Sequence, residues 1–115
     1  MSEQAFPVEL RAPERARRME IVWSDGVTTA YQHAILRGFC PCAHCQGHHG
    51  PVGWVPDAES MNLELTSIEP VGNYAVQFTW GDAHGTGIYT YAFLRDLAEI
   101  GESEVAFVKE RSFAR

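Results

Sequence analysis

The sequence has no apolar run that approaches the roughly 20 residues of a membrane-spanning helix. It also lacks a hydrophobic signal core near its N-terminus, so we expect a cytoplasmic protein. Basic residues are few, because 9 Lys and Arg stand against 15 Asp and Glu for a net charge of −6. This acidic balance argues against a protein surface that binds nucleic acid or anionic membranes. The basic cluster of Arg15, Arg17 and Arg18 is too short to reverse the balance.

Phosphate-binding loops are missing as well. The glycine-rich stretches Gly47 to Gly53 and Gly85 to Gly87 lack both a following Lys-Ser/Thr and the G-x-G-x-x-G spacing. No pairing of a nucleophile with a base stands out along the chain. At 115 residues we expect one domain with a modest core and no catalysis of its own.

Widely separated cysteines are absent too. Cys40, Cys42 and Cys45 are the whole complement and lie within six positions. Cysteines that fill a core would be scattered, and disulfide-forming cysteines would come in separated pairs, which the reducing cytoplasm would disfavour. The cluster therefore predicts three ligands on one ion, with a fourth supplied from elsewhere.

A histidine is the expected fourth ligand. His84 follows the strongest predicted strand, in a turn that would hold it rigidly, whereas His48 and His49 are closer in sequence but lie on a glycine-flanked stretch. Spacing alone leaves all three open, along with water. Zinc suits three cysteines and one histidine because it accepts a tetrahedral set of sulfur and nitrogen ligands. The alternative is an iron–sulfur cluster, in which histidine can replace cysteine.

Apolar periodicity predicts a small α+β fold. Alternation indicates strands over 19–23, 27–31 and 74–80, with a weaker strand over 63–70. A short helix is expected over 34–39. A second expected helix buries one apolar face and ends at a glycine cap; its residues are Phe93, Leu94, Leu97, Ile100 and Gly101.

Three segments follow from these patterns. Residues 1–17, broken by Pro7 and Pro13, are expected to be a loosely ordered lead-in, and 18–101 the domain itself. Residues 102–115 form a tail that can dock or fray. Residues 40–60 have no periodicity, so we expect an ordered loop held by metal.

The domain contains a hidden repeat. Each copy contains, in order, a tryptophan, an aspartate, a tyrosine and a leucine–arginine pair. The first copy is Trp23-x-Asp25, Tyr31 and Leu36-Arg37, and the second is Trp80-x-Asp82, Tyr89 and Leu94-Arg95. Tyrosine and leucine are five positions apart in both copies. The match predicts two β-hairpin-plus-helix halves related by pseudo-symmetry.

These residues carry a resemblance that covers roughly 15–98. The motifs are Trp23-x-Asp25-Gly26, Tyr31, Leu36-Arg37, the C-x-C-x2-C run, Val71-Gly72-x-Tyr74-Ala75 and Trp80-x-Asp82-x-His84-x-Thr86-Gly87-Ile88-Tyr89-Thr90 with Leu94-Arg95. Together they resemble the small domain at the N-terminus of γ-butyrobetaine hydroxylases, which also occurs alone as a bacterial family of unknown function.

The resemblance implies an α+β fold and a zinc bound by Cys40, Cys42, Cys45 and His84. One departure is Ala83, where the family commonly has glycine, which would matter if that position needs a positive φ. The hydroxylases carry their iron and 2-oxoglutarate chemistry on a separate C-terminal domain, so we expect none of that chemistry here.

We therefore expect a zinc-stabilised accessory module that binds a protein partner or a second copy of itself. The expected surface is the metal loop with His48, His49 and Trp54, although Trp54 could equally fold back over that loop. The second hypothesis is an accessory protein of iron–sulfur cluster assembly that holds a metal or cluster at the same ligands, since relatives of this domain are fused to ATPases of that pathway.

Overall fold

The structure is a computed structural model, which describes residues 5–13, 15–47, 50–85 and 87–114. The elements in chain order are β1 (Pro7–Arg11), β2 (Arg18–Trp23), β3 (Thr28–Gln32), α1 (His33–Gly38), α2 (Ala43–Gln46), β4 (Val52–Gly53), η1 (Ala58–Ser60), β5 (Leu65–Val71), β6 (Ala75–Trp80), β7 (Gly87–Thr90), α3 (Tyr91–Leu97), η2 (Ala98–Ile100), η3 (Val105–Phe107) and β8 (Ser112–Phe113). No helix among these residues is long and apolar enough to cross a membrane.

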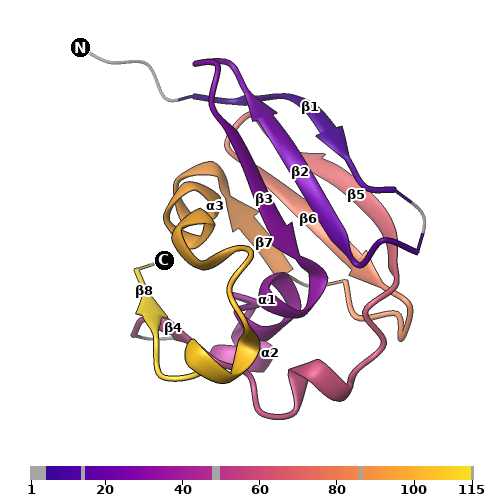
Figure 1. The fold of residues 1–115 in the computed structure, drawn as a ribbon, viewed down its shortest axis with the longest axis vertical. Coiled ribbons are helices and arrows are strands. Elements are labelled where there is room, and N and C mark those ends of the chain that lie inside the picture. Colours follow the sequence, from indigo (N-terminus) through magenta and orange to yellow (C-terminus); the bar gives the residue numbers. More distant parts are fainter. Residues whose placement is uncertain (1–4, 14, 48–49, 86, 115) are drawn as a thin grey trace.

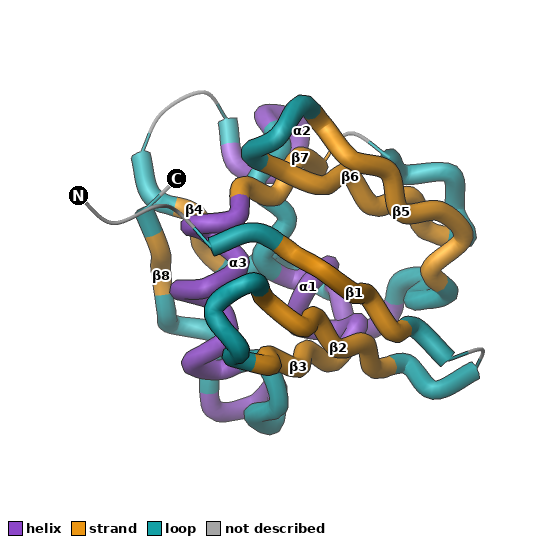
Figure 2. Tube along the Cα trace, turned by 90° about the horizontal axis from the view of Figure 1, so that it is seen from above, coloured by secondary structure: helices purple, strands orange, loops and turns teal. Residues whose placement is uncertain are grey.

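The described residues form two antiparallel three-stranded sheets, ordered β1-β2-β3 and β5-β6-β7. The sheets face each other, and α1 and α3 pack beside them (Figures 1 and 2). Alternate side chains of the central strands β2 and β6 are buried between the sheets, as the period-2 pattern predicts. Their large members, Trp23, Phe78 and Trp80, are at most 1% exposed.

The two halves repeat the same strand–turn–strand–helix unit, as the sequence match predicts. The matched tryptophans, tyrosines and leucines of both halves are all buried. The hydroxyl of Tyr31 donates to the carbonyl of Leu94 at 2.7 Å, and the hydroxyl of Tyr89 donates to the carbonyl of Leu36 at 2.5 Å. Each tyrosine thus bonds the helix of the opposite half at the same position, which is what a pseudo-two-fold axis requires.

The turns after the two tryptophans are built alike. In each, the tryptophan N–H donates to the carbonyl four residues later, at 2.8 Å for Trp23 and 2.9 Å for Trp80. The aspartate of each turn accepts from the backbone N–H two residues on, at 3.2 Å for Asp25 and 3.1 Å for Asp82. Both aspartates therefore stabilise local turns, the role that their positions favour.

The helices begin alike as well. The first helical residues, His33 and Tyr91, donate their backbone N–H to Arg17 and Tyr74, each at 2.8 Å. The ring of His33 packs edge-on against Trp80, and the ring of Tyr91 packs edge-on against Trp23. His33 and Tyr91 are therefore equivalent positions, each contacting the tryptophan of the opposite half.

Parts of both flanking segments form regular structure. Residues 7–11, expected within a loose lead-in, form edge strand β1, since its backbone pairs with β2 although its side chains are largely exposed. In the tail, β8 pairs with β4 and buries Val108 and Phe113. Gly101 is not a left-handed cap, because its φ is −53°; it is needed because a Cβ there would lie 2.0 Å from the carbonyl oxygen of Ala30.

The equivalent turn positions Gly26 and Ala83 both have positive φ, 85° and 69°. Glycine tolerates this conformation and alanine does not, at a cost of about 1 kcal/mol. Ala83→Gly should therefore raise the free energy of unfolding by up to about 1 kcal/mol, and Gly26→Ala should lower it by about 1 kcal/mol. Urea unfolding of the metal-loaded protein measures both. A stability loss in Ala83→Gly would contradict the equivalence of the turns.

Candidate metal centre

The three cysteines lie on a loop that its own backbone holds closed. Cys40 follows α1 directly, and Cys42 caps α2, whose residues Cys45 and Gln46 donate backbone N–H groups to the Cys42 carbonyl at 3.1 and 3.0 Å. The Gln46 amide donates to the carbonyls of Cys40 and Gly53, and accepts from the Gly53 N–H. This one side chain ties both ends of the segment together, so the thiols converge without a long helix or strand.

His84 reaches the thiols from the opposite half. It lies in the turn that joins β6 to β7, where the positive φ of Ala83 and the Asp82 carboxylate fix its backbone. Close approach of β7 completes the wall of the site, because a Cβ on Gly87 would lie 2.7 Å from the Sγ of Cys40. Of the three histidines that spacing leaves open, the fold brings His84 to the cysteines, the one that turn rigidity favours and that the resemblance implies.

The four ligand atoms surround a space of the size of one ion. The Nε2 of His84 lies 3.4, 3.7 and 3.7 Å from the Sγ atoms of Cys40, Cys42 and Cys45, and all four atoms are within 4.8 Å of one another. A tetrahedral ion with metal–sulfur bonds of about 2.3 Å and a metal–nitrogen bond of about 2.0 Å would place sulfur and nitrogen about 3.5 Å apart. The group can therefore hold a metal ion.

Comparison with known proteins agrees with this geometry. The family described as gamma-butyrobetaine hydroxylase-like, N-terminal, matches residues 10–95, a span that contains all four candidate ligands. The chain belongs to this family. Among proteins with curated descriptions, none matches the chain.

Solved structures share the fold of this gamma-butyrobetaine hydroxylase-like domain. A crystal structure of a DUF971-family protein of unknown function from Acidithiobacillus ferrooxidans is 37% identical, with a TM-score of 0.63 over 80% of this chain and 91% of that chain. Two solution NMR structures have TM-scores of 0.67 and 0.65 at 30% and 24% identity. They cover 86% and 87% of this chain and 73% and 77% of their own, and the more distant one shows the fold alone.

The site of this domain is poorly solvated. Burial raises the pKa values of the Cys40 and Cys45 thiols, so without an ion both are costly to ionise. A divalent cation offsets that cost, since it binds the thiolate forms and releases their protons. The donor set therefore suits a bound cation better than free thiols.

A buried arginine, Arg37, lies against the cysteines. Its side chain is 5% exposed, its Nη1 donates to the Sγ of Cys45 at 3.6 Å, and its Nε has no partner among the described residues. A divalent ion with three thiolates carries one net negative charge, which the guanidinium would balance. The sequence favours an aspartate or a helix-end carbonyl over an anion as the partner of Arg37, although it places Arg37 less than one helical turn before Cys40.

The equivalent arginine of the other half does something different. Arg95 pairs with Asp25 at 3.0 Å and lies over the Trp23 ring, 5.1 Å from its centre. The sequence favours the same kinds of partner for Arg95, and here the partner is an aspartate. The position equivalent to His84 is Val27 there, so only one of the two turns supplies a ligand.

The other sequence candidates divide into two groups. His48 and His49 lie outside the described residues. Trp54 is half-buried against the C-terminal end of α1, where a Cβ on Gly38 would lie 2.1 Å from its ring. It also packs edge-on against Phe39, with Lys109 over its face. Of the two expectations for Trp54, packing back onto the domain is what the structure shows.

The contrast between the two arginines can be measured. If the four residues hold a metal ion, Arg37→Met should weaken its binding about 10- to 100-fold, the usual effect of removing a group that supports a metal ligand. The same substitution should stabilise the metal-free protein, because it removes a buried cation that lacks a full set of partners. Arg95→Met changes the net charge equally, but Arg95 lies on α3 and pairs with Asp25 of the other turn, so the metal affinity of this variant should match the wild type. Competition with a chromophoric chelator gives both affinities, and an equal loss in both variants would contradict the assigned role.

Proposed function

We propose that the chain is a zinc-stabilised accessory module that works by binding a protein partner or a second copy of itself, without catalysis of its own. The supporting observation is the convergence of four side-chain ligands from two halves of the fold, all within 4.8 Å of one another. Three thiolates and one imidazole would complete the tetrahedral coordination of zinc. Such an ion would link the cysteine segment that follows α1 in the first half to the β6–β7 turn of the second half.

The compactness of the ligand set favours one ion over a cluster. In an iron–sulfur cluster the protein ligands bind different irons, which spreads them farther apart than the ligands of a single ion. Sulfur–nitrogen distances of 3.4 to 3.7 Å leave no room for several irons and sulfides between them. Zinc is therefore preferred to a cluster at the same four residues.

The closed ligand set also supports a non-catalytic role. Catalytic zinc keeps a coordination position open for water or substrate, whereas a complete set of four protein ligands does not. The expected binding surface is the outer face of the metal loop. Its aromatic residue, Trp54, is half-buried, so only part of its ring is available to a partner. The cytoplasmic location expected from the sequence remains part of this proposal.

Metal analysis of the natively purified protein tests the identity of the ion. We expect about one zinc per chain and a colourless protein, since a zinc site has no visible absorption. His84→Ala should lower the zinc content, because it removes one of the four candidate ligands. Iron and sulfide in a brown protein purified without air would contradict the proposal and support the cluster hypothesis.

Association is tested on the same preparation. Sedimentation velocity over a range of concentrations detects self-association, and crosslinking in the source cell detects a partner. We expect a complex that is lost when a chelator removes the zinc, because the loop that forms the surface depends on the ion. A zinc-loaded protein that stays monomeric, captures no partner and turns over a metabolite would overturn the proposal.

A further inference from the structure

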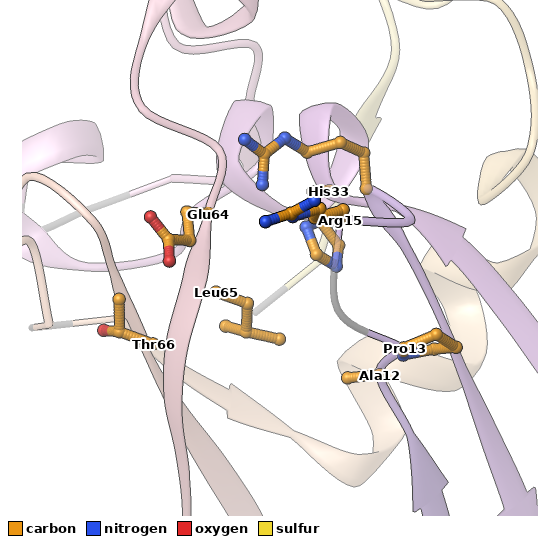
Figure 3. A pocket seen from close by; sticks show the side chains of 8 residues that line it. Ala12, Pro13, Arg15, His33, Glu64, Leu65 and Thr66 are labelled. Carbon is orange, nitrogen blue, oxygen red and sulfur yellow. The ribbon is translucent and has the colours of Figure 1, made fainter.

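A second site lies away from the cysteines, where the loop between β1 and β2 meets the start of β5. The pocket there has a volume of about 550 Å³, and its titratable lining residues are Arg15, Arg17, His33 and Glu64. Figure 3 shows Arg15 and His33 on one side of the pocket and Glu64 on the other. The pocket lies at the boundary of the two halves, a common place for ligand sites.

The pocket gathers positive charge in an acidic protein. Arg15 and Arg17 are exposed, and neither forms an ion pair with a carboxylate among the described residues, although the other ion pairs of this part of the chain engage Arg11 and Arg18. Both arginines have positive φ, 67° and 53°, a conformation that non-glycine residues rarely adopt. Two guanidinium groups in one concave site, without a carboxylate partner among the described residues, suit a carboxylate ligand, which arginine binds with two parallel hydrogen bonds.

His33 supplies an acceptor beside these cations. Its side chain is 3% exposed, and its Nδ1 lies 2.8 Å from the Leu63 carbonyl oxygen. A carbonyl only accepts, so Nδ1 must carry the proton, and in the neutral ring Nε2 is left with a lone pair. Nε2 has no partner among the described residues. Burial lowers the pKa of His33, with Arg17 adding to that effect and the Leu63 bond opposing it, which keeps the ring neutral.

The equivalent positions in the other half show which contacts of these residues belong to the shared fold. The equivalents of Arg17 and His33 in the other half are Tyr74 and Tyr91, which make the same backbone hydrogen bond. A tyrosine ring meets the opposite tryptophan there just as the His33 ring does. An aromatic ring is therefore enough for packing at this position. The arginine and the histidine, which can also bind a polar ligand, occur only on the side of the pocket.

We propose that this pocket binds a small carboxylate that also carries a hydrogen-bond donor, such as a hydroxy acid. The carboxylate lies between Arg15 and Arg17, and the donor reaches the free Nε2 of His33 or the Glu64 carboxylate. Because Nε2 is itself screened from solvent, binding requires a small adjustment of the pocket wall. This inference does not depend on the metal site.

Titration with L-malate and with succinate, which differ only in one hydroxyl, tests the proposal. The imidazole resonances of His33 in the zinc-loaded protein report binding. We expect saturable binding of malate and binding of succinate that is about tenfold weaker, the effect of one lost hydrogen bond in a buried site. Failure of malate to shift His33, or equal affinity for the two acids, would overturn the proposal.

Three variants locate the site. Arg15→Gln and Arg17→Gln should each weaken malate binding about tenfold, whereas Arg11→Gln, an equal charge change on β1 outside the pocket, should not. His33→Asn keeps a donor for the Leu63 carbonyl but has no atom in place of Nε2, so malate should fall to the affinity of succinate. If His33→Asn fails to fold, as judged by its metal content, the exposed arginine variants still decide. Equal losses in Arg11→Gln and Arg17→Gln would show non-specific attraction only and reject the site.

Discussion

Two buried tyrosine hydroxyl groups fix the position of one half of the fold relative to the other. The rest of the structure depends on that arrangement. Tyr31 and Tyr89 each donate to a carbonyl near the end of the opposite helix. A buried donor or acceptor without its partner costs about 1–3 kcal/mol, so the halves resist sliding past one another. Burial also raises the pKa of Tyr31 to about 12, so the hydroxyl remains a neutral donor even in moderately alkaline solution. With that register fixed, the turn after Trp80 lies where its histidine meets the cysteines that follow α1.

The same fold position is used in two ways. In one half, the turn carries Val27, and Arg95 pairs with Asp25 at the surface. In the other, the turn carries His84, and the equivalent arginine, Arg37, is buried against Cys45. An exposed ion pair contributes little to stability, whereas a buried guanidinium needs a full set of partners. A thiolate-bound ion would supply the compensating negative charge, so the metal loop and Arg37 form one electrostatic unit.

Much of this could be predicted from the sequence because its signals are local or repeated. The alternation of apolar and polar residues predicts strands β2, β3 and β6. The repeated spacing of tryptophan, tyrosine and leucine predicts the pseudo-symmetry. His84 was preferred from the rigidity of its turn. What could not be predicted depends on contacts between distant segments. Strand β1 is largely exposed and starts at Pro7, so its side chains carry little pattern, and the β4–β8 pair joins two-residue strands about 60 positions apart.

The pocket at His33 was missed for the same reason. A histidine at the start of a short helix has no distinctive neighbours in sequence, and its partners Leu63 and Arg17 come from other elements. Trp54 was ambiguous until its contact with Gly38 was known, although a glycine inside a predicted helix is a sign of close packing at that point. Comparison of the two halves, in which His33 takes the place of Tyr91, is what singles out the pocket.

The central claim is that one ion joins the two halves through Cys40, Cys42, Cys45 and His84. X-ray absorption spectroscopy at the zinc edge on the natively purified protein tests it most directly. The account predicts three sulfur ligands at about 2.3 Å and one nitrogen ligand at about 2.0 Å. In the His84→Ala variant the nitrogen contribution should disappear. A wild-type spectrum with four sulfurs, with several light ligands, or with no change on replacement of His84 would contradict the account.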